Sequence, residues 1–335
     1  MSESGDYSPG PAWSGHDFKD ARSYYDKHAG RSYDDARSSG KTLKDLLPES
    51  LETNSPFPLV IVSDQTGSMG KWPAVMFSKL PYLDHEVRTE YLGEDAEICF
   101  GAIGDAHCSG EDEEDYPLQM RPFSKGAKHK KSFDELVIEG GGGGQTTETY
   151  ELAALYLARN VHMPNALNPI VIFIGDEMPY DSVSKNMAKS IARVTLESAM
   201  STKDIFAELK EKFSVYFIQK PYDAESIERL GSTSKKIYAK WKTLVGEDHI
   251  ALLPQADRVV DVIFGILAKE SDKIDYFKKE IEGRQRADQV DTVYKSLDTI
   301  HRFPKDASST RKLLAAGRST MHKPLGGKPG KKLLP

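Results

Sequence analysis

The sequence predicts an α/β fold: a doubly wound, mostly parallel sheet with helices on both faces. Two observations support this prediction. From about residue 55, short apolar runs rich in β-branched residues recur along the chain, and stretches of helical pattern separate them. Such alternation is typical of parallel strands that are joined by crossover helices.

The strand-like runs are all short and apolar. The first, Leu59–Val62, is preceded by Pro56 and Pro58 and stopped by polar residues, as expected for a buried parallel strand. The run that ends at Ile174 is the most apolar, so we expect it near the centre of the sheet. The expected strands are Leu59–Val62, Ala96–Ile103, Ile170–Ile174, Phe213–Ile218 and His249–Leu253, with Tyr116–Phe123 as an added edge strand; the expected helices cover about 69–84, 148–160, 182–212, 224–244 and 255–270.

Composition divides the 335 residues into four expected segments. Residues 1–48 are rich in Ser, Gly, Asp, Tyr and Arg and poor in aliphatic side chains, so we expect an arm that is disordered or docks on another surface. Residues 49–271 form the α/β domain. Residues 272–302 show a charged helical pattern, which we interpret as a C-terminal helix, and 303–335 form a basic flexible tail.

The charge is distributed unevenly along the chain. The net charge is −6, yet residues 301–335 contain nine Lys or Arg and one acid, so this end carries +8 and the rest −14. A basic tail next to an arm rich in Tyr and Arg favours one alternative function, nucleic-acid binding through residues 301–335. The acidic core argues against a broad nucleic-acid footprint.

The sequence also indicates the compartment. No apolar run reaches the roughly 18 residues that span a membrane, and the N-terminus has no secretory signal pattern. Cys99 and Cys108 are the two cysteines; a disulfide between them is one option, and two separate thiols fit a reducing compartment better. We therefore expect a cytoplasmic protein without a membrane partner.

Oxygen-bearing side chains follow the first expected strand. The sequence Asp64-Gln65-Thr66-Gly67-Ser68 places a carboxylate and two hydroxyls at alternate positions where that strand ends. Ligands bind at the carboxyl ends of strands in open α/β sheets, and hard oxygen ligands suit Mg²⁺, Ca²⁺ or Mn²⁺. The alternative is structural, with Ser68 as the N-cap of the next helix.

Two later loops are expected at the same edge of the sheet. Five glycines, Gly140–Gly144, lead into Gln145-Thr146-Thr147-Glu148-Thr149 at the start of a helix, and no Gly-Lys-Ser/Thr of a phosphate loop follows them. Asp176 stands directly after the most apolar strand. As a lone residue it would be a turn or helix cap, but as the third oxygen cluster at one edge we interpret it as a ligand.

These three elements together resemble the von Willebrand factor A (vWA) domain, a Rossmann-like fold, and its metal-ion-dependent adhesion site. The resemblance covers about residues 55–270 and matches Asp64-x-Thr66-x-Ser68, a Thr in the glycine-rich loop and Asp176. Helix phase favours Thr146 for the loop position. Thr147 is the next choice, and Glu148 and Thr149 remain open. The chain reads Gly-Asp-Glu around Asp176, where the family usually reads Thr-Asp-Gly.

The resemblance implies a function as well as a fold. Thr66, Ser68 and Thr146 would bind Mg²⁺ directly, and Asp64 and Asp176 would act partly through water, leaving one position open for a partner's Asp or Glu. The family usually binds proteins without catalysis, so we expect a metal-dependent protein-binding adaptor and not an enzyme. Intracellular members often serve AAA+ ATPases or other multi-subunit complexes.

The sequence supports an enzymatic function less well. Gly104-Asp105-Ala106-His107 has the Asp-x-His of dinuclear metallophosphatases, but the chain lacks that family's other histidine motifs. A haloacid-dehalogenase-type phosphatase needs a second Asp at position 66, where this chain has Thr. We therefore expect Asp105 to be a loop residue at the same edge of the sheet. The acidic run at 111–115 lacks the spacing of an EF-hand and is expected to be a solvated loop.

Overall fold

The computed structural model describes residues 13–14, 16, 18–108, 115–138, 146–222 and 229–301. The chain divides into two compact units, residues 1–301 and 302–335, and the described residues all belong to the first. Three features singled out in the sequence therefore lie outside the described residues: the basic tail, the five glycines before Gln145, and the acidic run apart from Asp115.

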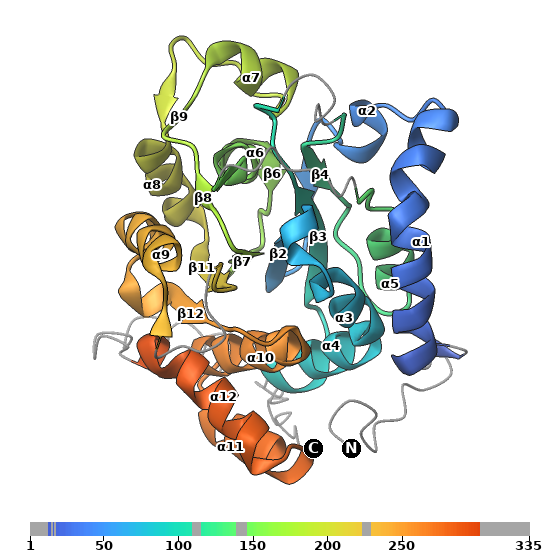
Figure 1. The fold of residues 1–335 in the computed structure, drawn as a ribbon, viewed down its shortest axis with the longest axis vertical. Coiled ribbons are helices and arrows are strands. Elements are labelled where there is room, and N and C mark those ends of the chain that lie inside the picture. The colour runs from blue at the N-terminus through green and yellow to red at the C-terminus, as the bar shows by residue number, and fades with distance from the viewer. Residues whose placement is uncertain are drawn as a thin grey trace, which may run out of the picture. The chain divides into compact units, whose positions relative to one another are not determined.

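The main sheet of the described residues has six strands in the order β12-β11-β7-β2-β3-β4 (Figure 1). Neighbouring strands are parallel except at one edge, where β4 runs antiparallel to β3. The five expected strands and the expected edge strand are thus confirmed. Their bounds are β2 (Pro58–Asp64), β3 (Glu97–Ile103), β4 (Leu118–Met120), β7 (Ile170–Gly175), β11 (Ser214–Gln219) and β12 (Ile250–Leu252).

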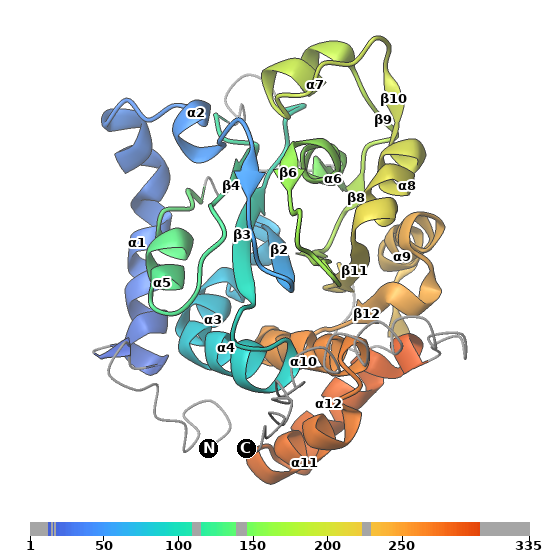
Figure 2. The same cartoon turned by 180° about the vertical axis from the view of Figure 1, so that it is seen from behind.

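The central strands β2 and β7 carry two apolar layers. Because successive side chains of a strand point to opposite faces, Leu59 and Ile61 join one core cluster, while Val60 and Val62 join the other. Helices α3, α4 and α10 contribute to the first cluster and α6, α8 and α9 to the second (Figures 1 and 2). These helices are α3 (Trp72–Ser78), α4 (Leu80–Glu86), α6 (Tyr150–Asn160), α8 (Thr202–Lys212), α9 (Ser232–Val245) and α10 (Val259–Glu270).

Shorter elements connect these layers. Three small two-stranded pairs join β1 (Leu51–Glu52) to β6 (Val161–His162), β5 (Thr147–Glu148) to β8 (Met178–Pro179), and β9 (Ser182–Val183) to β10 (Met200–Ser201). The remaining short helical elements are α2 (Leu43–Leu46), η2 (Gly67–Met69), η3 (Val87–Tyr91), α5 (Lys128–Asp134), η6 (Glu247–His249), η7 (Ala256–Arg258) and η8 (Asp298–His301).

The arm at residues 1–48 contains a long helix, α1 (Phe18–Ser38), which packs against α3. Tyr25 is only 4% exposed, and its ring stacks on Phe77 with the centroids 4.7 Å apart. Ala21 and Trp13 join the same core cluster. The described part of the arm is therefore docked on its own domain. The composition of residues 1–48 did not reveal this docking, because the contact depends mainly on aromatic rings and the segment is poor in aliphatic side chains.

The helical stretch expected at 182–212 is divided in two. Helix α7 (Lys185–Ser190) ends early, and α8 begins only at Thr202. The backbone of Arg193 has a φ of 55°, which turns the chain out of the helical path. Ser201 restarts the helix as an N-cap, because its hydroxyl accepts a bond from the backbone N–H of Asp204 at 3.2 Å.

The C-terminal segment 272–302 also differs from the single expected helix. It forms two helices, α11 (Ile274–Arg284) and α12 (Ala287–Leu297). The break falls at Gln285 and Arg286, which both have extended backbones. Gln285 is buried against Asp261, to which its side-chain amide donates a bond of 2.9 Å. Both helices pack on α10 of the same domain.

Two expectations concern the environment of the chain. Both cysteines are free thiols, with Cys99 buried in β3 and Cys108 partly exposed in the loop that follows it. None of the helices built from described residues combines the length and the apolar character that crossing a bilayer requires.

Candidate metal centre

Two of the three predicted oxygen clusters meet where the two central strands end. Asp64 is the last residue of β2, and Asp176 directly follows β7, its parallel neighbour. Both carboxylates are fully buried. From β2 the chain continues to β3 on one side, whereas from β7 it continues to β11 on the other (Figure 1). The strand order thus reverses between β2 and β7, and open α/β sheets bind ligands at such a point.

A chain of hydrogen bonds joins four of the predicted residues. Asp64 Oδ1 accepts bonds from the backbone N–H of Thr66 at 2.8 Å and from its hydroxyl at 2.6 Å. Thr66 Oγ1 lies 3.2 Å from Ser68 Oγ, and the Ser68 hydroxyl donates to Asp176 Oδ1 at 2.9 Å. Ser68 is solvent-exposed, so this chain runs from the buried carboxylates to the surface.

Ser68 does not cap the following helix. It lies inside η2, and α3 begins at Trp72 with Lys71 at its N-cap. The structural alternative that the sequence left open for Ser68 is therefore wrong. The side chain is turned instead toward the end of the neighbouring strand.

Two residues that sequence reasoning missed complete the carboxylate contacts. The Tyr150 hydroxyl, at the start of α6, donates to Asp64 Oδ2 at 3.0 Å. The Lys220 ammonium, just after β11, donates to Asp176 Oδ2 at 2.5 Å. The position of Lys220 was the available signal, because it follows a third parallel strand at the same edge. Tyr150 carried no such signal.

The glycine before Asp176, Gly175, is required by close packing. A Cβ at this position would lie 1.8 Å from the Tyr150 hydroxyl oxygen and 3.2 Å from Asp64 Cβ. Only glycine leaves room for the Tyr150 hydroxyl to reach Asp64. The missing side chain before Asp176 is thus linked to the bond between Tyr150 and Asp64.

Burial and like charge disfavour the ionised form of Asp64. Burial, followed by the negative charge of Asp176, raises the pKa of Asp64 to about 7. The donors to Asp64 are an N–H group and two hydroxyls, all neutral. Gln65, only 4% exposed, has no hydrogen-bond partner among the described residues for either side-chain atom. The site therefore contains more buried polar atoms than its neighbours satisfy.

The contact between the two hydroxyls has a further consequence. When Asp64 and Asp176 are ionised, each can only accept hydrogen bonds. The Thr66 hydroxyl hydrogen then goes to Asp64 and the Ser68 hydroxyl hydrogen to Asp176. No hydrogen remains for the 3.2 Å contact between the two hydroxyl oxygens, so their lone pairs face each other. Paired oxygen lone pairs beside buried carboxylates fit a hard divalent cation.

The threonines of the next loop lie apart from this chain. Thr149 is fully buried, and its hydroxyl donates to the carbonyl of Gly104 at 2.6 Å, so it holds the end of β3. The Thr147 side chain bonds to Tyr180. Thr146 precedes β5, and its carbonyl accepts a bond from Met178 N at 3.1 Å. Among the described residues, no hydrogen bond joins Thr146 or Thr147 to Asp64 or Asp176, so the loop ligand stays a prediction.

Other acidic side chains lie near the centre, but among the described residues they form no second metal site. Glu148 and Glu177 share a hydrogen bond, and burial, followed by the charges of Asp64 and Asp176, raises the pKa of Glu177 to about 8. Burial also raises the pKa of Glu151 to about 8. In the part of the chain that the structure describes, no group of three or more His, Cys, Asp or Glu is arranged to hold a metal. Any metal here would depend on the hydroxyls.

The loop that contains Asp105 has a structural explanation. Asp105 is 1% exposed and accepts bonds from the Tyr180 hydroxyl at 2.9 and 3.0 Å and from His107 N at 2.9 Å. The His107 ring packs on Tyr180 with the centroids 3.9 Å apart. Asp105 thus orders its own loop at the end of β3.

Comparison with protein-family models and with curated protein sequences gave no match. Among solved structures, the pilus adhesin SpaC of Lactobacillus rhamnosus GG in its open conformation is similar over 67% of this chain, with 10% identity and a TM-score of 0.44. A second form of SpaC gives 13% identity, the same coverage and a TM-score of 0.42. Proximal thread matrix protein 1 of the mussel byssus is similar over 66% of this chain, with 11% identity and a TM-score of 0.43. The chain spans 30% and 31% of the two adhesin structures and 49% of the mussel protein.

Proposed function

We propose that this protein is a vWA-like module that binds a divalent cation and, through it, an acidic residue of a protein partner. One observation carries the proposal: the hydroxyl oxygens of Thr66 and Ser68 lie 3.2 Å apart, and each hydroxyl also donates to one of two buried carboxylates. The strand order supports it. Numbered along the chain, the sheet reads 3-2-1-4-5-6 from the antiparallel edge, which is the doubly wound order.

The hydroxyl and carboxylate residues have different roles in the proposed site. Thr66 and Ser68 would hold the cation directly, with Thr146 or, failing that, Thr147 from the next loop. Asp64 and Asp176 would orient the hydroxyls and balance the charge. Mg²⁺ is the expected ion, with Ca²⁺ or Mn²⁺ as substitutes, because every donor is a hard oxygen. When bound, the cation supplies an electrophilic position that a carboxylate can occupy.

The partner contributes the remaining ligand. Ser68 and Gly67 are exposed, so a side chain from another protein can approach the site from solvent. Because this role needs capture and not turnover, we propose a binding adaptor and not an enzyme. Partners presenting Asp or Glu, such as an AAA+ ATPase or another multi-subunit complex, fit this chemistry.

A titration with Mn²⁺, followed by electron paramagnetic resonance, tests the site. We expect one bound ion per wild-type chain and none in Asp64→Asn. Asp105→Asn is the matched control, because it removes a buried carboxylate of the same edge that lies outside the proposed ligand set. Binding of acidic peptides should require Mg²⁺ and be reversed by EDTA. If Asp64→Asn binds Mn²⁺ as the wild type does, the proposal fails.

A further inference from the structure

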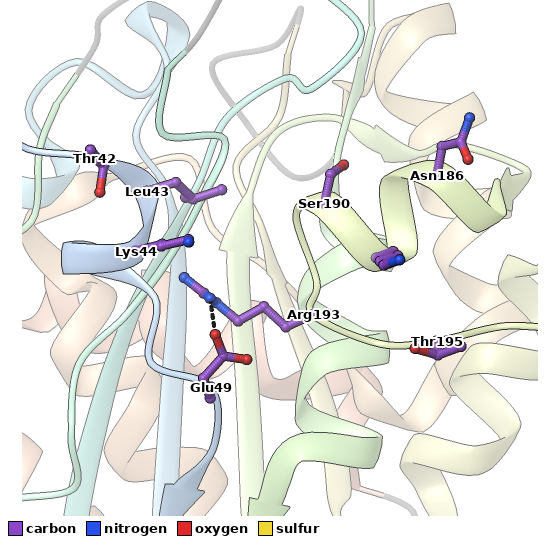
Figure 3. Close-up of a pocket in the computed structure, with 9 residues that line it drawn as sticks. Thr42, Leu43, Lys44, Glu49, Asn186, Ser190, Arg193 and Thr195 are labelled. Carbon is purple, nitrogen blue, oxygen red and sulfur yellow. Dashed lines mark hydrogen bonds and ion pairs between the residues drawn. The ribbon is translucent and has the colours of Figure 1, made fainter.

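A second polar site lies between α2 and α7. The pocket there has a volume of about 950 Å³, which is large enough for a small organic ligand. Three cations line it, Lys44, Lys189 and Arg193, against a single acid, Glu49. Figure 3 shows Lys44 pointing toward the Arg193 guanidinium, with Glu49 bonded to that same group. The hydroxyl of Ser190 adds a neutral donor to the wall.

The backbone is constrained to place Arg193 in this wall. Its φ of 55° costs a non-glycine residue about 1 kcal/mol. The turn is held from the far end of α6, where the Asn160 side-chain amide donates to the carbonyls of Ala192 at 3.1 Å and Arg193 at 3.4 Å. Val194 N bonds back to Ala188 O at 2.8 Å. The fold thus fixes a strained residue whose side chain is only 10% exposed.

The Arg193 guanidinium has donor capacity to spare. Its Nη1 bonds to Glu49, whose side chain is 81% exposed. Its Nε is buried and has no partner among the described residues. An ion pair with so exposed an acid contributes about 1 kcal/mol or less, so a better anion can displace Glu49. Guanidinium groups bind phosphate through strong charge-assisted bonds, and displacement of Glu49 would release Nη1 for such a bond.

We propose that this pocket binds the phosphate group of a small phosphorylated molecule. Arg193 would hold the phosphate at the wall, and Lys44 and Lys189 would balance its remaining charge. The volume exceeds that of one phosphate and leaves room for the rest of a nucleotide-sized molecule. The site is separate from the metal centre. Tyr150 at the first turn of α6 contacts Asp64, whereas Asn160 at the last residue of this helix bonds to the backbone of the turn that carries Arg193.

Isothermal titration calorimetry in EDTA, at constant ionic strength, tests this inference. The probes are inorganic phosphate, pyrophosphate, ADP and, as a carboxylate control, citrate. We expect pyrophosphate or ADP to bind the wild type more tightly than citrate does. Lys44→Gln combined with Lys189→Gln should weaken binding at least about tenfold, since two charge-assisted contacts are lost. Glu49→Gln should strengthen it several-fold by freeing Arg193.

A matched control separates the pocket from overall charge. Lys236→Gln combined with Lys278→Gln removes two exposed lysines from α9 and α11 and should leave affinity unchanged. All variants change surface positions and leave the strained backbone of Arg193 intact, and circular dichroism checks that they fold. The inference is overturned by any of three results: no phosphate probe binds, citrate binds as tightly as pyrophosphate, or the control pair weakens binding as much as the pocket pair.

Discussion

Two buried aspartates of this protein have opposite electrostatic surroundings. Asp84 in α4 accepts bonds from His129 Nε2 at 3.0 Å, Gly126 N at 2.7 Å and both the Nε and Nη2 atoms of Arg88 at 3.1 Å. Asp64 receives bonds from an N–H group and two hydroxyls, and its nearest charge is another carboxylate. Both residues are at most 2% exposed, so burial alone does not distinguish them.

The pKa values of the two groups move in opposite directions. At Asp84, burial would raise the pKa, but the bonds from His129, Arg88 and Gly126 outweigh it and lower the pKa to about 2. At Asp64, burial and Asp176 together raise the pKa to about 7. Asp84 is bonded directly to a cationic side chain, Arg88, whereas the Lys220 ammonium of the other centre donates to Asp176 and not to Asp64. The contrast separates a carboxylate whose ionised form the fold stabilises from one whose ionised form it disfavours, and the second kind is the candidate for the proposed cation.

Replacing the satisfied carboxylate should have the largest effect on stability. We expect Asp84→Asn to lower the free energy of unfolding by about 3 kcal/mol, because the buried His129 and the half-buried Arg88 lose the carboxylate to which they donate, and Arg88 keeps only Glu94. Urea denaturation at pH 7 measures this. Since the folded pKa is depressed below the ordinary 3.8, the stabilisation is present above pH 4 and disappears as the pH falls toward 2. The difference between wild type and variant should therefore shrink over that window; a constant difference would contradict the assignment.

Adding Mg²⁺ should have the next largest effect on stability. Mg²⁺ at a hundred times its dissociation constant should stabilise the wild-type protein by about 2.7 kcal/mol, since it binds only the folded state. Thermal unfolding with Mg²⁺ and with EDTA measures the difference. Asp84→Asn should retain the full increment, because its site is not involved. An equal increment in Asp64→Asn would show that the ion binds elsewhere.

Removing the Lys220 ammonium should strengthen metal binding. Lys220 already donates to Asp176, so it competes with a divalent ion for the same carboxylate. We expect Lys220→Met to raise Mn²⁺ affinity about fivefold, or about 1 kcal/mol. Lys240→Met is the control, because Lys240 pairs with the exposed Asp181 at the surface. If both variants change affinity equally, net charge and not competition is responsible.

Replacing Asp64 should have the smallest effect on stability. In EDTA, Asp64→Asn should change the free energy of unfolding by about 1 kcal/mol or less, because an amide oxygen still accepts from Thr66 and the repulsion with Asp176 disappears. Urea denaturation of the two Asn variants side by side gives the comparison directly. Equal losses at positions 64 and 84 would remove the distinction between the two sites.

The sequence was sufficient where local pattern determines structure. The strands β2, β3, β7, β11 and β12 were predictable because their apolar runs are short, β-branched and bounded by polar residues. The proximity of Asp64 and Asp176 followed from the rule that parallel strands end at one edge. Both predictions depend on spacing along the chain.

Contacts between distant segments were not predictable in the same way. Tyr150 reaches the site through packing that no spacing encodes, whereas the position of Lys220 directly after β11 was a signal that the sequence analysis did not use. The docking of α1 depends on single aromatic contacts such as that of Tyr25 with Phe77. The break at Arg193 was missed because arginine favours helices, and the bonds from Asn160 that hold the turn come from another element.

The close approach of Tyr150 to Gly175 also restricts the order in which substitutions can accumulate. A methyl group at position 175 would overlap the tyrosine hydroxyl at 1.8 Å, so even Ala, and all the more the Thr of the family pattern, is blocked while Tyr150 is present. Tyr150→Phe removes that oxygen but leaves the ring carbon Cζ 2.8 Å from the methyl group, so a side chain smaller than phenylalanine at position 150 has to come first. The two positions are thus epistatic: each substitution is acceptable or harmful according to the residue at the other.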